Sequence, residues 1–130
     1  MESTKDIWFI DDDETFRFVM KHLMQDTAYA DAITYFDDGD RAVLKLVEMA
    51  KTGKSGPKLI LLDLSMKYLE GWQLIDLMNE FKVSSKVAIL TSSIHVKDKT
   101  RAAQEPLVTD FLTKPVSREQ IIQVIEKSLA

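Results

Sequence analysis

The sequence predicts an α/β fold in which a five-stranded parallel sheet carries helices on both faces. Five short apolar segments alternate along the 130 residues with longer segments in which apolar residues recur every three to four positions. Three of the five short segments are apolar throughout, which is typical of parallel strands that are covered on both faces. The alternation of strands and helices favours a single parallel sheet with helical crossovers.

The five predicted strands are short. The first (residues 7–10), the third (59–62) and the fourth (87–90) consist of apolar residues only. The second (32–36) and the fifth (108–112) contain polar residues. Because an edge strand is less completely covered than a central one, we expect these two strands at the edges of the sheet.

Four helices are predicted from apolar residues at positions i, i+3, i+4 and i+7, which share one face of a helix. The four sets are Phe16/Val19/Met20/Leu23, Val43/Leu46/Val47/Ala50, Leu74/Leu77/Met78/Phe81, and Ile121/Val124/Ile125 followed one turn later by Leu129. Ser117 and Gln120 form a capping box that starts the last helix. Residues 95–104 are more polar and weakly periodic, and we predict a further helix there.

The composition is that of an ordinary single domain, with 45% hydrophobic and 29% charged residues. A net charge of −4 argues against nucleic acid or an anionic membrane as the main partner. The chain contains no cysteine, which excludes disulfides and thiolate metal sites. It shows neither a signal peptide nor an apolar run near the roughly 20 residues that span a bilayer. We therefore expect a cytoplasmic protein.

Polar side chains follow four of the predicted strands at the point where each strand ends. They are Asp11, Asp12 and Asp13 after the first strand, Asp63 after the third, Thr91, Ser92 and Ser93 after the fourth, and Thr113, Lys114 and Pro115 after the fifth. In parallel sheets, ligands bind outside the carboxyl ends of the strands. Several acids at one rim suit a hard divalent cation with oxygen ligands, and Lys114 offsets charge or holds an anion.

Each of these residues also has a simpler structural role when it is considered alone. Asp13 fits the N-cap of the following helix, because a carboxylate there accepts hydrogen bonds from free backbone amides. Thr91 fits a turn or cap hydroxyl, and Lys114 fits a solvated loop residue. Asp63 is harder to explain in this way, because it ends the most apolar strand of the chain.

Four segments, taken in order, resemble the receiver domain of two-component response regulators over essentially the whole chain. They are FIDDD with Asp11 and Asp12, LILLDLSMKYLEGW with Asp63, Met66 and Gly71, AILTSS with Thr91 and Ser92, and DFLTKP with Lys114 and Pro115. Each motif is weak alone, but the ordered set is specific. The resemblance implies a flavodoxin-like, doubly wound sheet in the order 2-1-3-4-5. It also implies that residues 1–130 form a single receiver domain without an output domain.

The resemblance implies the chemistry of the site as well. Asp63 is the expected phosphoacceptor, and Asp11, Asp12, Asp63 and the backbone carbonyl of Ser65 are the expected Mg²⁺ ligands, with Asp11 acting mainly through a water. Lys114 supplies an ammonium to the phosphoryl group and precedes a cis proline in the family. The protein is then not an enzyme in the usual sense, but is expected to catalyse its own phosphorylation and dephosphorylation.

The resemblance further implies a switch and two kinds of partner. Thr91 moves toward the new phosphoryl group, and Phe111, at the position of the family's switch aromatic, fills the vacated space. The surface around the fifth strand then changes for a downstream protein that the sequence does not identify. The phosphodonor is expected to be a sensor histidine kinase or a histidine phosphotransfer protein.

Several residues depart from the usual receiver pattern. Lys67 stands where the family often has proline, and residues 105–109 replace a small dipeptide often found before the fifth strand. Phe111 has no hydroxyl with which to lock an inward position. Ser65 and Ser93 occupy positions that tune dephosphorylation in the family.

Two alternatives fit parts of the same sequence. A degenerate receiver would act as a protein-binding module without phosphorylation, although every acidic and lysine position is filled. A haloacid dehalogenase-type phosphatase would use Asp11 as nucleophile, Asp13 as acid/base and Thr15 as the third residue of its motif. That family also needs an acidic cluster on a later strand, and it leaves Asp63 unexplained.

Overall fold

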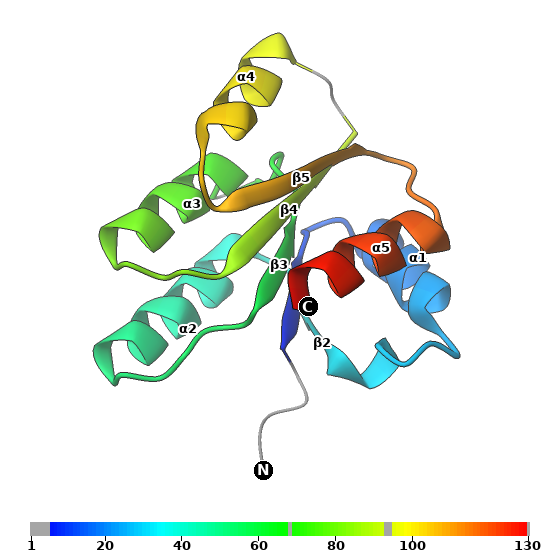
Figure 1. Ribbon diagram of the computed structural model, residues 1–130, viewed down its shortest axis with the longest axis horizontal. Coiled ribbons are helices and arrows are strands. Elements are labelled where there is room, and N and C mark those ends of the chain that lie inside the picture. Colours follow the sequence, from blue (N-terminus) through cyan, green and yellow to red (C-terminus); the bar gives the residue numbers. More distant parts are fainter. Residues whose placement is uncertain (1–5, 68, 93–94, 130) are drawn as a thin grey trace.

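Five parallel strands form one sheet in the order β2-β1-β3-β4-β5 in the computed structural model, which describes residues 6–67, 69–92 and 95–129 (Figure 1). The strands are β1 (Ile7–Ile10), β2 (Ile33–Phe36), β3 (Leu59–Leu62), β4 (Lys86–Thr91) and β5 (Val108–Thr113). The predicted fold class and strand order are therefore confirmed. The two strands with polar residues, β2 and β5, lie at the two edges, as expected.

A helix follows each strand, and the first four helices connect successive strands. They are α1 (Glu14–Met24), α2 (Gly39–Lys51), α3 (Gly71–Glu80), α4 (Val96–Gln104) and α5 (Arg118–Leu129). The weakly periodic stretch does form a helix, α4. The second strand starts one residue later than predicted, because Ala32 ends a short 3₁₀ turn, η1 (Ala30–Ala32). Within the described part of the chain, no helix is long and apolar enough to cross a bilayer.

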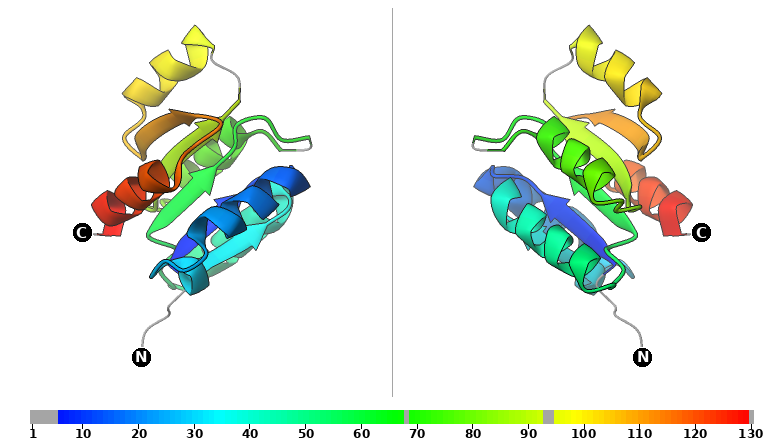
Figure 2. Two further views of the ribbon diagram at one scale, coloured as in Figure 1. Left: turned by 90° about the vertical axis from the view of Figure 1, so that its right-hand side faces the viewer. Right: turned by 90° about the vertical axis from the view of Figure 1, so that its left-hand side faces the viewer.

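The helices cover both faces of the sheet, α2 and α3 on one side and α1 and α5 on the other (Figures 1 and 2). Because successive strand residues point to opposite faces, one apolar run supplies two cores. Trp8 and Ile10 belong to the core under α2 and α3. Ile7 and Phe9 belong to the core under α1 and α5. This two-sided burial explains why β1, β3 and residues 87–90 of β4 contain no polar residue.

Local hydrogen bonds fix where the helices begin. The Asp13 carboxylate accepts from the amides of Thr15 and Phe16 at the start of α1, so the N-cap role considered for Asp13 is confirmed. Such a cap stabilises a helix by about 1 kcal/mol. At α5, the predicted capping box is present: the Ser117 amide donates to Gln120 Oε1 and the Gln120 amide donates to Ser117 Oγ.

The register of the sheet brings the carboxyl ends of the central strands level. Ile10 pairs with Leu62, and Leu62 pairs with Ile89. The next residues along β1 and β3 are Asp11 and Asp63, which therefore emerge side by side at one edge. Hydrogen bonding alone thus delivers two carboxylates from distant parts of the chain to one place.

Candidate functional site

Three carboxylates meet at the carboxyl edge of the sheet. Within the described residues, Asp11, Asp12 and Asp63 each offer an oxygen within 4.8 Å of the others. Asp11 is fully buried and Asp63 is 5% exposed, whereas Asp12 is half-buried at the rim. Carboxylates packed this closely repel one another unless a cation lies among them. The arrangement answers why three aspartates follow an apolar strand: the first two form a charged cup and the third caps a helix.

Lys114 supplies positive charge to this cup from the far edge of the sheet. Its Nζ atom lies 2.8 Å from Oδ2 of Asp11 and 3.8 Å from Oδ2 of Asp63. The amide of Lys114 donates to the carbonyl of Thr91 at 2.8 Å, which ties the end of β5 to the end of β4. The Lys114–Pro115 peptide bond is cis, as the family resemblance implied.

Phe16 forms an aromatic wall beside this lysine. The Nζ atom lies 4.1 Å from the centre of the Phe16 ring. A cation over an aromatic face is stabilised by the ring quadrupole. The long side chain of Lys114 is therefore oriented by an ion pair at its tip and by an aromatic contact at the same atom.

The environment of Asp63 favours its protonated form compared with a carboxyl group in water. Burial, which is the largest cause, and the neighbouring Asp11 carboxylate together raise the pKa of Asp63 from 3.8 to about 6, against the opposing effect of the Lys114 ammonium. The Ser65 amide also favours the charged form, because it donates to Asp63 Oδ1 at 3.3 Å. With a pKa of about 6, Asp63 is mainly ionised at neutral pH, and its charged form is destabilised by burial.

Asp12 is held by the loop that follows β3. The backbone amide of Lys67 donates to Asp12 Oδ2 at 2.8 Å. Proline has no backbone N–H and cannot make this bond. The departure at Lys67 therefore has a structural consequence: a non-proline residue at this position connects the acidic rim after β1 to the loop that carries Ser65.

Gly71 allows the loop after Asp63 to return close to the strand. A Cβ at this position would lie 2.9 Å from the carbonyl oxygen of Asp63 and 2.9 Å from Cα of Leu64. Both atoms belong to the backbone and cannot move aside as a flexible side chain can. The Gly71 amide also donates to the Leu64 carbonyl at 3.0 Å. The glycine noted in the sequence is thus required by close packing against the backbone of Asp63 and Leu64.

Thr91 and Phe111 lie where the sequence predicted them, at the ends of β4 and within β5. Thr91 is buried at the strand end beside Lys114. Phe111 pairs with Ile89 in the sheet and packs partly buried against the core under α2 and α3. A groove of about 330 Å³ between α4 and β5 is lined in part by Phe111 and Ala102. Ser93 lies outside the described residues.

The structure adds a cluster that sequence reasoning missed. The Trp72 indole N–H donates to Asp98 Oδ1 at 2.9 Å, which joins α3 to α4. The Arg101 guanidinium lies 4.4 Å from the centre of the Trp72 ring and pairs with Asp76 at 2.7 Å. Trp72 and Asp98 also line a hollow of about 550 Å³ that reaches Asp12. No local motif signals this contact, because its partners come from separate helices.

The phosphatase alternative is disfavoured by the position of Asp13. Its carboxylate is engaged by the first amides of α1, and the cluster formed by the described acids contains Asp11, Asp12 and Asp63 only. A general acid/base at Asp13 would have to leave its helix cap. Asp63, which that reading leaves unused, lies at the centre of the site instead.

Comparisons with known proteins agree with this geometry. The family model described as the response regulator receiver domain matches residues 7–126. The crystal structure of a two-component response regulator from Cytophaga hutchinsonii superposes with a TM-score of 0.79 and 28% identity, and the match covers 95% of each chain.

Two curated relatives match at similar identity. An uncharacterised 14.6 kDa protein of Leptolyngbya boryana is 25% identical over 94% of this chain and 88% of its own length. The transcriptional regulatory protein PcoR of Escherichia coli is 27% identical over 86% of this chain, which spans 45% of PcoR. On the family match and the site geometry together, the chain belongs to the response regulator receiver domain family.

Proposed function

We propose that the protein is a phosphoacceptor in two-component signalling, in which Asp63 receives a phosphoryl group from a sensor histidine kinase or a histidine phosphotransfer protein. The observation that carries this proposal is the buried Asp63 carboxylate, which lies beside two further carboxylates and 3.8 Å from the Lys114 ammonium. Both families of donor are expected in the cytoplasm, where the reaction would take place.

In the proposed reaction an oxygen of Asp63 attacks phosphorus in phosphohistidine. The new P–O bond forms as the P–N bond breaks, and the electron pair of that bond stays on the imidazole, which takes a proton from solvent. The pKa of about 6 supports this role, because Asp63 is then mostly ionised and nucleophilic at neutral pH. Lys114 stabilises the negative charge on the transferring oxygens.

The donor set of the site fits Mg²⁺, which prefers oxygen ligands. Three carboxylates share the cup and one ammonium contacts it, so the cup carries excess negative charge. We expect Asp12 and Asp63 to hold the ion directly, Asp11 to act mainly through water, and Ser65 to contribute its backbone carbonyl. When bound, Mg²⁺ supplies positive charge that stabilises the phosphoryl oxygens.

Phosphorylation is proposed to change the surface around β5. The phosphoryl oxygens offer acceptors to the Thr91 hydroxyl at the end of the neighbouring strand. Phe111 lies on the next strand and borders the groove between α4 and β5. A coupled movement of Thr91 and Phe111 would therefore alter this groove, which is the expected binding surface of the downstream protein.

Intact-mass spectrometry after incubation with acetyl phosphate and Mg²⁺ tests the acceptor. We expect the wild type to gain one phosphoryl group, Asp63→Asn to gain none, and the control Asp13→Asn to behave as wild type, because asparagine is an equally good helix cap. Loss of the label after the donor is removed measures the dephosphorylation that the protein is proposed to catalyse. A wild type that gains no mass would instead favour a binding module that works without phosphorylation.

A pulldown identifies the partners. Wild type and Asp63→Asn are compared with and without phosphodonor, and the captured proteins are identified by mass spectrometry. We expect at least one protein to be captured by the phosphorylated wild type alone. Identical partners in every condition would contradict a phosphorylation-controlled output.

A further inference from the structure

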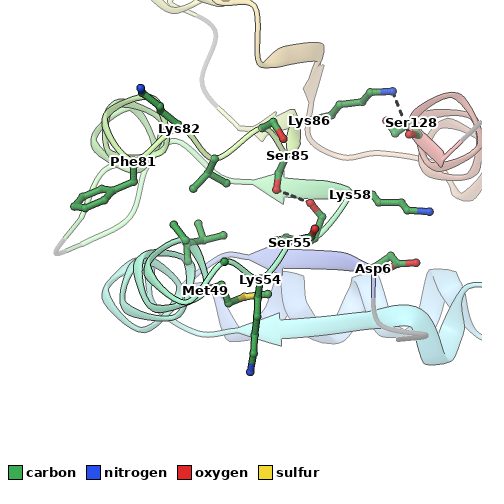
Figure 3. Close-up of a pocket in the computed structure, with 17 residues that line it drawn as sticks. Asp6, Met49, Lys54, Ser55, Lys58, Phe81, Lys82, Ser85, Lys86 and Ser128 are labelled. Atoms are coloured by element: carbon green, nitrogen blue, oxygen red, sulfur yellow. Dashed lines mark hydrogen bonds between the residues drawn. The ribbon is translucent and has the colours of Figure 1, made fainter. Parts of the chain in front are cut away.

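A groove of about 850 Å³ lies at the amino-terminal ends of the strands, at the opposite end of the sheet from Asp63 (Figure 3). It is formed by the loop between α2 and β3, the loop between α3 and β4, and the end of α5. No residue of the phosphoacceptor site lines it. The groove is therefore separate from the site described above.

Hydrogen bonds between the two loops hold the groove in shape. The Ser85 hydroxyl donates to the Pro57 carbonyl, which joins one wall to the other (Figure 3). The Lys86 amide donates to the Lys58 carbonyl at 3.0 Å, and the Lys58 amide donates to the Asp6 carbonyl at 2.8 Å. The walls are thus fixed by the main chain in the absence of any ligand.

The groove combines apolar lining with a basic rim. Leu46, Met49, Phe81 and Val83 contribute apolar surface. Four exposed lysines stand around it, namely Lys54, Lys58, Lys82 and Lys86, against one carboxylate, that of Asp6. In residues 6–67, 69–92 and 95–129, no carboxylate lies within 4.0 Å of these four amines. The whole chain carries −4, so this edge opposes the overall charge.

Lys82 on this rim has a backbone conformation, with positive φ, that is unfavourable for lysine. Helices α2 and α3 end in the same way: the Lys54 amide donates to Met49, and the Val83 amide donates to Met78, each at 2.8 Å. The residue with positive φ in this motif is Gly53 after α2 but Lys82, with φ 59°, after α3. Glycine adopts this conformation without strain and lysine does not. A lysine at a glycine position adds charge to the rim and weakens the fold.

The directions of the side chains indicate the kind of ligand. Lys54, Lys58 and Lys82 extend away from one another around the groove (Figure 3), so they cannot converge on one phosphate. Spread charges around apolar surface suit an extended chain with several acids. Ser128 also lines the groove, and its Oγ is buried with no hydrogen-bond partner among the described residues.

We propose that this groove binds an extended acidic segment of a partner protein, with an apolar side chain of the segment against the lining and its carboxylates beside the lysine rim. Nucleic acid fits less well, because the lining, as far as the structure describes it, includes no arginine for phosphate and a single aromatic residue, Phe81, for base stacking. Binding here does not require Asp63 and is expected in both phosphorylation states.

Titration by NMR with a short peptide of aspartate and glutamate around two leucines tests the site. We expect the amides of residues 54–58 and 82–86 to shift, equally in wild type and Asp63→Asn. A peptide with asparagine and glutamine in place of the acids is expected to bind at least about tenfold more weakly. Shifts confined to other surfaces, equal binding of both peptides, or tighter binding of single-stranded DNA in the same groove would each overturn the proposal.

Charge reversal with a matched control tests the rim. We expect the double variant Lys54→Glu/Lys82→Glu to lower the affinity for the acidic peptide about tenfold or more, because two positive charges that attract the peptide become negative charges that repel it. The control, Lys45→Glu with Lys97→Glu, changes the net charge equally at exposed positions outside the groove. It is expected to lower the affinity for the acidic peptide by less than about twofold at physiological salt. Equal losses in the two double variants would contradict a specific site. Lys82→Gly is expected to lower the affinity for the peptide and to stabilise the fold. Weaker binding by this variant could therefore not be attributed to unfolding.

Discussion

Lys114 is paired with Asp11, with 2.8 Å between Nζ and Oδ2, while Asp63, the proposed phosphoacceptor, lies 3.8 Å from the same amine. The ammonium is therefore held at the site by a carboxylate other than the proposed acceptor. The ion pair is largely buried. Its loss has consequences for folding and for reactivity that can be measured separately.

Lys114→Gln is expected to destabilise the fold by about 3 kcal/mol at neutral pH without Mg²⁺, because it leaves the Asp11 charge buried and unpaired. The same change is expected to slow phosphorylation by acetyl phosphate by at least about tenfold. Urea denaturation and intact-mass kinetics give the two values. Lys127→Gln, which breaks the exposed pair with Asp110, is the control and is expected to cost less than about 1 kcal/mol. Equal effects of the two substitutions would contradict the role of the buried pair.

Asp63→Asn is expected to stabilise the metal-free protein at pH 7.5. The folded-state pKa of about 6 exceeds the ordinary value of 3.8, so the folded state binds this proton more tightly and stability falls as the pH rises through that window. Solvent at the rim screens the penalty, and we expect a gain of about 1–2 kcal/mol.

The pH dependence provides the check on this gain. Urea denaturation in EDTA should show the advantage of Asp63→Asn at pH 7.5 and the loss of most of it by pH 4, where the wild-type carboxyl is protonated in the folded state and partly protonated in the unfolded state. Asp13→Asn should follow the wild type at every pH. An advantage that is independent of pH would point to a cause other than the Asp63 charge.

Mg²⁺ is expected to raise the midpoint of thermal unfolding of the wild type, because the ion binds the folded cup and not the unfolded chain. Asp12→Asn removes one of three clustered carboxylates and is expected to weaken Mg²⁺ binding by at least about tenfold. Isothermal titration calorimetry measures the affinity directly. Asp38→Asn, at the N-cap of α2, keeps its cap and should bind Mg²⁺ as the wild type does.

Gly71→Ala is expected to destabilise the protein by about 2 kcal/mol or more, because the new Cβ would lie 2.9 Å from backbone atoms of Asp63 and Leu64. The displaced loop should also lower the phosphorylation rate. Gly39→Ala is the matched control: its nearest neighbours are side-chain atoms of Leu69 and Met66, which can adjust. Denaturation curves in which Gly39→Ala is the more damaging change would contradict this account.

Lys82→Gly is expected to stabilise the protein by about 0.5–1 kcal/mol, since glycine adopts positive φ without a Cβ clash. The reciprocal change after α2, Gly53→Lys, should destabilise by a similar amount, because Gly53 has φ 75° in the same motif and open space around it. Thermal unfolding of the two variants and of the double variant measures both effects. A destabilised Lys82→Gly would contradict the strain assigned to this lysine.

The strands and the site core were predictable because each depends on a short stretch of sequence. A run such as Leu59–Leu62 is typical of a strand that is buried on both faces in the interior of a parallel sheet. Parallel register then carries Asp11 and Asp63 to one edge whatever the helices do. The same reasoning allows Asp13 to be either an acid at the predicted metal-binding rim or the N-cap of the following helix, and the structure shows that it is the N-cap of α1.

Other features depend on contacts between distant segments and leave no local pattern. The hydrogen bond from the Lys67 amide to Asp12 joins residues that are 55 positions apart. From the sequence, Lys67 is notable only because it stands where the family often has proline. The groove with the lysine rim combines the end of α5 with two loops, each of which looks like an ordinary solvated loop when it is considered alone. Burial of Asp63, and hence its raised pKa, is likewise a property of the assembled site.

The contact between Trp72 and Asp98 makes helix movement visible in solution without any attached dye. Trp72 is buried, donates a hydrogen bond to Asp98 of α4 and lies against the Arg101 guanidinium. A movement of α4 would therefore change the environment of the indole, and with it the wavelength and intensity of its fluorescence. Trp8 lies in the sheet against Phe36 and keeps its surroundings, which provides a built-in reference signal. Stopped-flow fluorescence can therefore time the response of α4 from the protein's own two tryptophans.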